Sequence, residues 1–257
     1  MQQVIFLVIA GILIPFAGTA LGAAAVFLMK KDVGQGVQKL LSGFAAGVMV
    51  AASIWSLLLP ALERAAPPAW LSPSVGFVLG IGFLMLSEAG IVGLQKRGKK
   101  QTQSPSKNAM LILAVTLHNI PEGLAVGVAY AGAFEERTQR ALAAAFLLAL
   151  GIAVQNIPEG AIISMPLRGE GKSRWYSFAC GSLSGAVEPV AAALTFWMTA
   201  AVSRALPLLL AFAAGAMFYV CVDELIPEAK SKGKINMGVV GFGVGFLLMM
   251  ILDVALG

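Results

Sequence analysis

Two copies of the pentapeptide Asn-Ile-Pro-Glu-Gly lie in long apolar stretches of the chain, at residues 119–123 and 156–160. His118 directly precedes the first copy. On a helix with about 100° per residue, Glu122 lies about 40° from His118 and about 60° in the other direction from Asn119. One carboxylate therefore stands between an imidazole and an amide, which favours a metal site over a simple hydrogen bond between helices.

The second copy repeats this arrangement with an amide on each side of the carboxylate. Gln155 and Asn156 flank Glu159 on its helix. Imidazole nitrogens and carboxylate and amide oxygens suit borderline to hard divalent ions such as Zn²⁺, Fe²⁺ or Mn²⁺. Two antiparallel neighbouring helices could present two adjacent ion sites bridged by Glu122 and Glu159. The repeated motif therefore predicts a metal site between two helices.

Proline accompanies the carboxylate in three of the apolar stretches. Pro121 and Pro158 have no N–H to donate to the preceding turn, so each predicts a kinked helix with a free carbonyl. At membrane depth such carbonyls are tolerated where they line a cavity. Glu188-Pro189 repeats the pairing in a third stretch. Glu188 is therefore a further candidate ligand, the alternative being a protonated structural carboxyl.

The Lys and Arg residues lie at or beyond the ends of the apolar stretches, away from these carboxylates. An ionised side chain at mid-membrane costs about 2.5–3.5 kcal/mol on insertion scales. Protons or metal ions must then supply the counter-charge. Glu88, Asp223 and Glu224 lie nearer the ends of their stretches and are either interfacial carboxylates that reach water or part of an ion path. Asp253, near the end of the last stretch, is expected to be solvated.

The composition places most of the chain in lipid. Of the 257 residues, 58% are hydrophobic and only 12% are charged, whereas a soluble domain carries about a quarter charged residues. A soluble enzyme is thereby excluded. The first apolar run has no basic region before it and continues to about Met29, so we interpret it as a membrane helix rather than a signal peptide. Cys180 and Cys221 lie in apolar stretches and indicate no disulfide framework.

Eight stretches are long enough to cross a bilayer, at about 20 residues each, and they form a single transmembrane domain over residues 1–257. The predicted spans are 3–29, 37–59, 71–94, 108–132, 139–165, 174–202, 206–227 and 237–256. Fourteen of the 18 Lys and Arg residues fall near the odd-numbered connections. The positive-inside rule then places these connections in the cytoplasm and both termini outside. The net charge of +5 indicates attraction to an anionic lipid leaflet rather than to nucleic acid.

Pairs of small residues recur along the predicted spans at a spacing typical of closely packed membrane helices. Met49 in the second span would by itself also be interpreted as a packing residue. The glycine pairs are Gly18/Gly22, Gly43/Gly47, Gly76/Gly80, Gly123/Gly127, Gly181/Gly185 and Gly241/Gly245.

At these motifs the chain resembles the ZIP (Zrt/Irt-like) family of divalent metal transporters, in particular its bacterial GufA-type branch. The resemblance covers nearly the whole chain: eight spans, His-Asn-Ile-Pro-Glu-Gly in span four, the matching motif in span five and Glu-Pro in span six. It implies an all-α integral membrane bundle with kinked helices four and five at a central metal site. It further implies a bacterial cytoplasmic (inner) membrane location with both termini on the periplasmic side, and it suggests a homodimer.

The resemblance also implies a binuclear centre and a route from it to the cytoplasm. One ion would be held by His118, Glu122, Gln155 and Glu159, with Met49 nearby, and the second by Asn119, Glu122, Asn156, Glu159 and Glu188. Asp223 and Glu224 would lie on the route to the cytoplasm, joined by Glu88.

The sequence thus predicts uptake of Zn²⁺, or of Fe²⁺, Mn²⁺ or Cd²⁺, toward the cytoplasm, with no prosthetic group. The resemblance implies an elevator-like movement, and a channel-like mode stays open. Two features depart from relatives: the connection at 95–107 has no histidine, and Asn156 stands where some relatives have Asp, which lowers the charge of the second site. A membrane metallohydrolase with Glu122 as general base is an alternative, but the His-Glu-x-x-His motif is absent. A proton-coupled carrier of organic solutes would normally use a membrane Lys or Arg.

Overall fold

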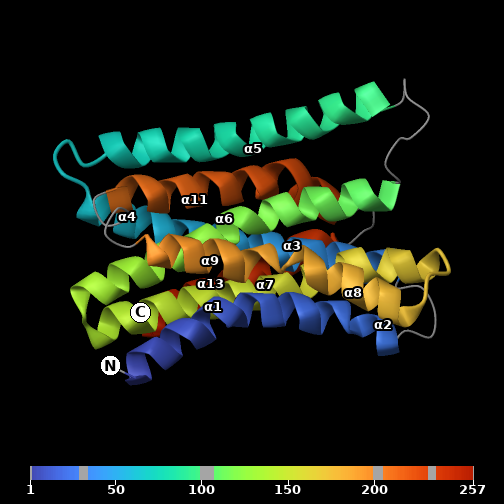
Figure 1. Ribbon diagram of the computed structural model, residues 1–257, viewed down its shortest axis with the longest axis horizontal. Coiled ribbons are helices and arrows are strands. Elements are labelled where there is room, and N and C mark those ends of the chain that lie inside the picture. Colours follow the sequence, from blue (N-terminus) through green and yellow to red (C-terminus); the bar gives the residue numbers. More distant parts are fainter. Residues whose placement is uncertain (1, 29–33, 99–106, 199–204, 231–235, 257) are drawn as a thin grey trace.

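The computed structural model describes residues 2–28, 34–98, 107–198, 205–230 and 236–256. Within these ranges, the side chains of residues 2–5, 91–98, 107–115, 117–118 and 256 lie outside the description. All regular structure in the described ranges is helical, and most of the long helices follow one long axis as a bundle (Figure 1). The predicted all-α architecture is confirmed.

Four predicted spans form one helix each, and the other four are divided into shorter segments. The helices are α1 (Gln2–Ala23), α2 (Ala25–Leu28), α3 (Gln35–Ala52), η1 (Ser53–Leu58), α4 (Leu59–Arg64), α5 (Leu71–Gly98), α6 (Lys107–Glu136), α7 (Gln139–Gly169), α8 (Arg174–Ser184), α9 (Val187–Trp197), α11 (Leu206–Val220), η3 (Cys221–Leu225), α12 (Ile226–Ala229) and α13 (Met237–Leu256). The segments η1 and η3 are π-helical.

Seven helical segments in the described part of the chain are long and apolar enough to cross a membrane, and they match seven predicted spans. They are Phe6–Leu28, Gln35–Arg64, Leu71–Gly90, Gln139–Gly169, Arg174–Trp197, Leu206–Ala229 and Met237–Ala255. The predicted span at 108–132 lies within α6, whose 30 residues pack in the same bundle. The count of eight spans stays a prediction.

The main helix pairs are α1 with α7, α3 with α13, α5 with α11, and α6 with α9. In each pair, glycines lie directly against the backbone of the partner helix. In the first pair, Gly18 meets the backbone carbonyl of Ala153, and Gly160 meets that of Thr19. A Cβ at either glycine would overlap the carbonyl oxygen. The predicted glycine pairs are all confirmed as contacts, namely Gly18, Gly22, Gly43, Gly47, Gly76, Gly80, Gly123, Gly127, Gly181, Gly185, Gly241 and Gly245.

The proline-containing spans behave in two different ways. Both α6 and α7 continue through Pro121 and Pro158 as single helices. Span six instead breaks after Ser184, and α9 begins anew at Val187. This break places Glu188 in the first turn of α9, where the helix dipole favours a carboxylate. The sequence did not predict the break.

An internal repeat accompanies the two π-helical segments. The sequence Phe-Ala-Ala-Gly occurs at 44–47 in α3 and at 212–215 in α11. Each of these helices then passes into a π-helical segment, followed by Pro60 or Pro227. α3 packs against α7 and α11 packs against α6, so the repeat flanks both motif helices. Single π-helical turns inside α-helices are frequent at functional sites.

Candidate metal centre

The two Asn-Ile-Pro-Glu-Gly motifs meet where α6 and α7 pack together. Gln155 Nε2 donates a 2.6 Å hydrogen bond to Glu122 Oε1. Both side chains are buried, and Glu122 is only 1% exposed. A hydrogen bond to a carboxylate is about twice as strong as one between neutral groups. This contact therefore fixes the position of one motif relative to the other.

Glu188 of α9 joins both motifs and a third helix. Asn119 Nδ2 donates to Glu188 Oε1 at 3.0 Å, and Asn156 Nδ2 donates to Oε2 at 2.8 Å. Thr19 of α1 donates its hydroxyl to Oε1 at 3.1 Å. All four side chains are buried. One carboxylate thereby ties α1, α6 and α7 to the start of α9.

These hydrogen bonds decide which way each asparagine amide points. Asn119 Nδ2 also lies 3.2 Å from the carbonyl oxygen of Ser184, and Asn156 Nδ2 lies 3.4 Å from that of Pro15. Each nitrogen therefore faces two acceptors, and only an NH₂ group can donate to both. The oxygen of each amide is consequently turned away from Glu188.

Four buried oxygens in this region have no hydrogen-bond partner among the described residues. They are Asn119 Oδ1, Glu122 Oε2, Gln155 Oε1 and Asn156 Oδ1. An unpaired buried polar atom costs about 1–3 kcal/mol, and most such atoms have a partner. A divalent cation would supply that partner, because amide and carboxylate oxygens are suitable ligands for it. We call these four residues the amide–carboxylate cluster.

For the remaining predicted ligands, the structure gives the helix on which each lies, and for two of them the burial of the side chain. Glu159 is 8% exposed and lies on α7 one turn after Asn156. Met49 is 1% exposed on α3, while His118 belongs to α6 with its side chain outside the description. Among the described residues, no three His, Cys, Asp or Glu side chains group together as metal ligands. Amides instead supply three of the four unpartnered oxygens.

Comparison with known proteins identifies the family. The sequence model described as "ZIP Zinc transporter" matches residues 93–253. Zinc transporter ZIP11 of Xenopus tropicalis is 39% identical, and the match covers 96% of this chain and 96% of that protein. The chain belongs to the ZIP family. The human Zinc transporter ZIP11 is 36% identical over 98% of each chain, and Zinc transporter GufA of Myxococcus xanthus is 35% identical over 94% of this chain and 96% of its own.

Membership confirms the resemblance drawn from the motifs, including its GufA-type branch, and with the apolar helices it makes the ZIP chain an integral membrane protein. The three residues predicted for the cytoplasmic route lie on α5 and in η3. Tyr219 of α11 donates a 2.7 Å hydrogen bond to Glu88 of α5. Asp223 is exposed and Glu224 is partly exposed in η3. Their part in a metal path stays a prediction.

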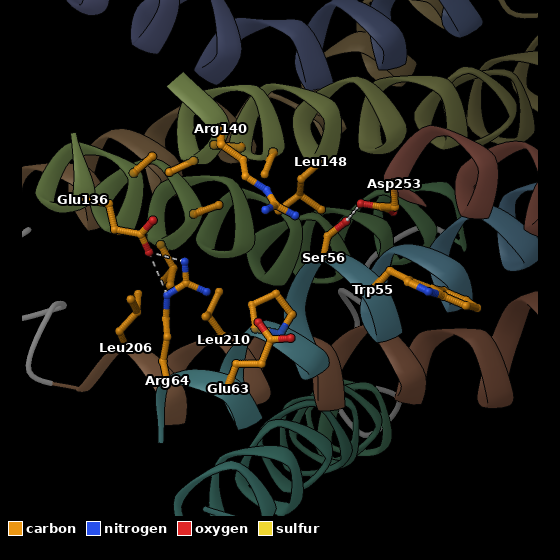
Figure 2. A pocket seen from close by; sticks show the side chains of 18 of the residues that line it. Trp55, Ser56, Glu63, Arg64, Glu136, Arg140, Leu148, Leu206, Leu210 and Asp253 are labelled. Atoms are coloured by element: carbon orange, nitrogen blue, oxygen red, sulfur yellow. Dashed lines mark hydrogen bonds and ion pairs between the residues drawn. The ribbon is translucent and has the colours of Figure 1, made fainter. Parts of the chain in front are cut away.

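α1 begins and α13 ends at the same end of the bundle (Figure 1). A pocket of about 590 Å³ lies there, lined by residues of η1, α4, α6, α7, α11 and α13 (Figure 2). We call it the vestibule. Arg64 of α4 pairs with Glu136 of α6 beside it, and Ser56 donates a 2.6 Å hydrogen bond to Asp253 (Figure 2).

The expectation that Asp253 is simply solvated was wrong, because this side chain is partly buried and Oδ2 has no hydrogen-bond partner among the described residues. Arg140 extends into the vestibule from α7 (Figure 2).

The vestibule stops short of the amide–carboxylate cluster. Its lining includes Ser56 and Leu148. Ser56 lies seven residues after Met49, and Leu148 lies seven residues before Gln155. Seven helical residues span about 10 Å. Ile152 is fully buried at the intermediate level of α7. Apolar side chains therefore separate the vestibule of the ZIP chain from its candidate metal centre.

Two functional candidates are not recognisable from the sequence alone. Thr19 looks like one more small residue of an apolar helix, and its contact with Glu188 joins residues 169 positions apart. Ser56 likewise meets Asp253 across 197 positions. The only local signal was a hydroxyl or carboxylate in an otherwise apolar span, which does not name its partner.

Proposed function

We propose that the ZIP chain carries Zn²⁺, or a similar divalent transition-metal ion, across the membrane through the amide–carboxylate cluster. The observation that carries this proposal is the set of four buried oxygens without partners. The donors recorded on Glu122 and Glu188 in the described structure are amides and a hydroxyl, with no Lys or Arg among them. A cation is therefore the natural counter-charge. The relatives named above are called zinc transporters, which supports zinc as the cargo.

The centre is proposed to hold two adjacent ions. The unpartnered oxygens fall into two pairs, one around the Gln155–Glu122 hydrogen bond and one on the asparagines that bind Glu188. The first ion would take Glu122, Gln155, Glu159 and His118, with Met49 nearby, and the second would take Asn119, Asn156 and the shared glutamates, with Glu188 beside them.

The direction of transport is proposed from charge. Fourteen of the 18 basic residues lie near the odd-numbered connections, so the positive-inside rule puts the opposite end, which holds the vestibule, outside the cell. Ions would enter the vestibule beside Asp253, pass the level of Ile152 and leave past η3 and Glu88. In a bacterium this is uptake across the cytoplasmic membrane.

The passage of the ion is proposed to use an elevator-type movement. Glycine contacts join α1 to α7 and α6 to α9, and separately join α3 to α13 and α5 to α11. Close glycine packing holds helices together as a unit. We infer that α1, α6, α7, α8 and α9 move as one unit against the remaining helices. The family resemblance also suggests a homodimer.

Transport is tested with purified protein in proteoliposomes that contain a zinc-sensitive dye and a pH-sensitive dye. The wild-type chain is expected to admit Zn²⁺ when the ion is added outside. Glu122→Ala removes one unpartnered oxygen and the acceptor of Gln155, so it is expected to lower the flux at least a hundredfold. Glu135→Ala, which removes an exposed carboxylate from the same helix, is the matched control and is expected to retain flux.

A folded Glu122→Ala protein with wild-type zinc flux would refute the assignment of the cluster as the transport site. Absence of zinc flux in wild-type vesicles, together with flux of another divalent ion, would replace zinc as the cargo but keep the site. The pH-sensitive dye reports in the same vesicles whether protons accompany the ion.

A further inference from the structure

Thr19 lies on α1, which carries neither motif, and its side chain contacts Glu188 at the candidate centre. Its side chain is fully buried in α1, and its Oγ1 lies 3.1 Å from Glu188 Oε1. The same hydroxyl lies 3.4 Å from the carbonyl oxygen of Pro15, one turn earlier. A threonine hydroxyl has a single proton to donate. Of the two acceptors, the Glu188 carboxylate is the closer and the stronger. The hydroxyl therefore donates its proton to Glu188.

The surrounding backbone leaves room for this contact at the break between α8 and α9. Gly185 lies at that break, and a Cβ there would come within 2.7 Å of Thr19 Oγ1 and 2.8 Å of Glu188 Oε1. The absence of a side chain at Gly185 thus permits the hydroxyl and the carboxylate to meet. From α7, Gly160 packs against the Thr19 carbonyl. Both neighbours position this turn of α1.

We propose that Thr19 is a positioning residue for metal binding, holding Glu188 in the conformation that turns the oxygens of Asn119 and Asn156 toward the ion. This inference rests on the proposed function, because it assigns those oxygens to the transported cation. Three donors from three helices bind the two oxygens of Glu188. Without Thr19, the carboxylate keeps only its two amide donors and can rotate with them. The contacts of the amide nitrogens with the Ser184 and Pro15 carbonyls remain, so the amide oxygens keep their general direction but are held less tightly.

Two substitutions separate the hydroxyl of Thr19 from its shape. Thr19→Val keeps the branched side chain and removes the donor, whereas Thr19→Ser keeps the donor and removes a methyl group. A hydrogen bond to a charged group contributes enough to change an equilibrium about tenfold or more. Thr19→Val is therefore expected to raise the KM for zinc flux and the Kd for zinc of detergent-purified protein about tenfold. Thr19→Ser is expected to stay within about twofold of wild type in both.

A purely structural role would act differently, and two further measurements detect it. The melting temperature and the Vmax of Thr19→Val report general damage, and both are expected to stay near wild type while KM and Kd change. In a Glu188→Gln background, Thr19→Val is expected to change the zinc Kd less than twofold, because the partner through which it acts has lost its charge.

Three results would overturn the inference while leaving the proposed function intact. They are a Thr19→Val protein with wild-type KM, a Thr19→Ser protein as impaired as Thr19→Val, and a tenfold effect of Thr19→Val that persists without the Glu188 charge. Wild-type flux and zinc affinity in Glu122→Ala would instead overturn the proposed function, and this inference with it.

Discussion

Gly160 offers the sharpest test of how α1 is held against the candidate centre. A Cβ built on Gly160 would overlap the Thr19 carbonyl oxygen and lie 2.8 Å from the backbone nitrogen of Ala23. Ordinary contact begins at 3.4 Å. Gly160→Ala therefore forces α1 to retreat from α7 by more than half an ångström, since both obstacles are backbone atoms and cannot rotate away.

That displacement has an energetic and a functional consequence. Overpacking of this kind destabilises the folded protein by about 1–3 kcal/mol. The better helix propensity of alanine offsets about 0.5–1 kcal/mol of this. The hydrogen bond from Asn156 Nδ2 to the Pro15 carbonyl already measures 3.4 Å, and a contact of about 3.6 Å no longer counts as one. Gly160→Ala should therefore lower the melting temperature by a few degrees and raise the KM for zinc several-fold.

The assay is zinc flux in proteoliposomes together with thermal unfolding of the purified protein. Gly82→Ala is the matched control, because nothing lies within 4 Å of a Cβ at that position of α5, and it should leave both quantities unchanged or slightly raise the melting temperature. If Gly160→Ala melted and transported like wild type, the close approach of α1 to α7 described above would be refuted.

Two further predictions concern side chains outside the cluster. Asp253→Asn removes a charge from the vestibule while retaining an acceptor for Ser56. Zinc flux at low zinc concentration should therefore fall several-fold while Vmax is unchanged. Initial rates over a range of zinc concentrations measure both quantities. An unchanged KM would exclude Asp253 from ion capture. Tyr130→Phe removes a buried hydroxyl without a hydrogen-bond partner among the described residues, which costs about 1–3 kcal/mol when buried, so the melting temperature should rise. A clear fall would show that the hydroxyl has a partner in the protein.

The repeated motif and the apolar spans made the membrane architecture and the family predictable. Both signals are local: a span is recognised from about 20 successive residues, and the angular relation of Glu122 to its neighbours follows from helix geometry alone. The same local logic predicted glycine contacts such as Gly18 against Ala153, because small residues repeat with the helical turn.

The direction in which each ligand atom points depends on contacts that no local pattern encodes. Asn156 was recognisable as a donor or an acceptor, but only Glu188 and the Pro15 carbonyl, on two other helices, bind its nitrogen and so turn its oxygen away from Glu188. The break between α8 and α9 that sets Glu188 at a helix start was equally invisible, because Gly185 occurs in a run that otherwise predicts one span.

The sequence by itself thus determined a membrane protein of the ZIP family with carboxylates and amides on two motif helices, because composition and helical spacing act over a few turns. Only the tertiary structure decided that Thr19 reaches Glu188 and that Ser56 reaches Asp253, across 169 and 197 positions of the chain. Most buried hydroxyls in proteins have an acceptor. Which acceptor it finds is settled by how glycine lets the helices approach one another.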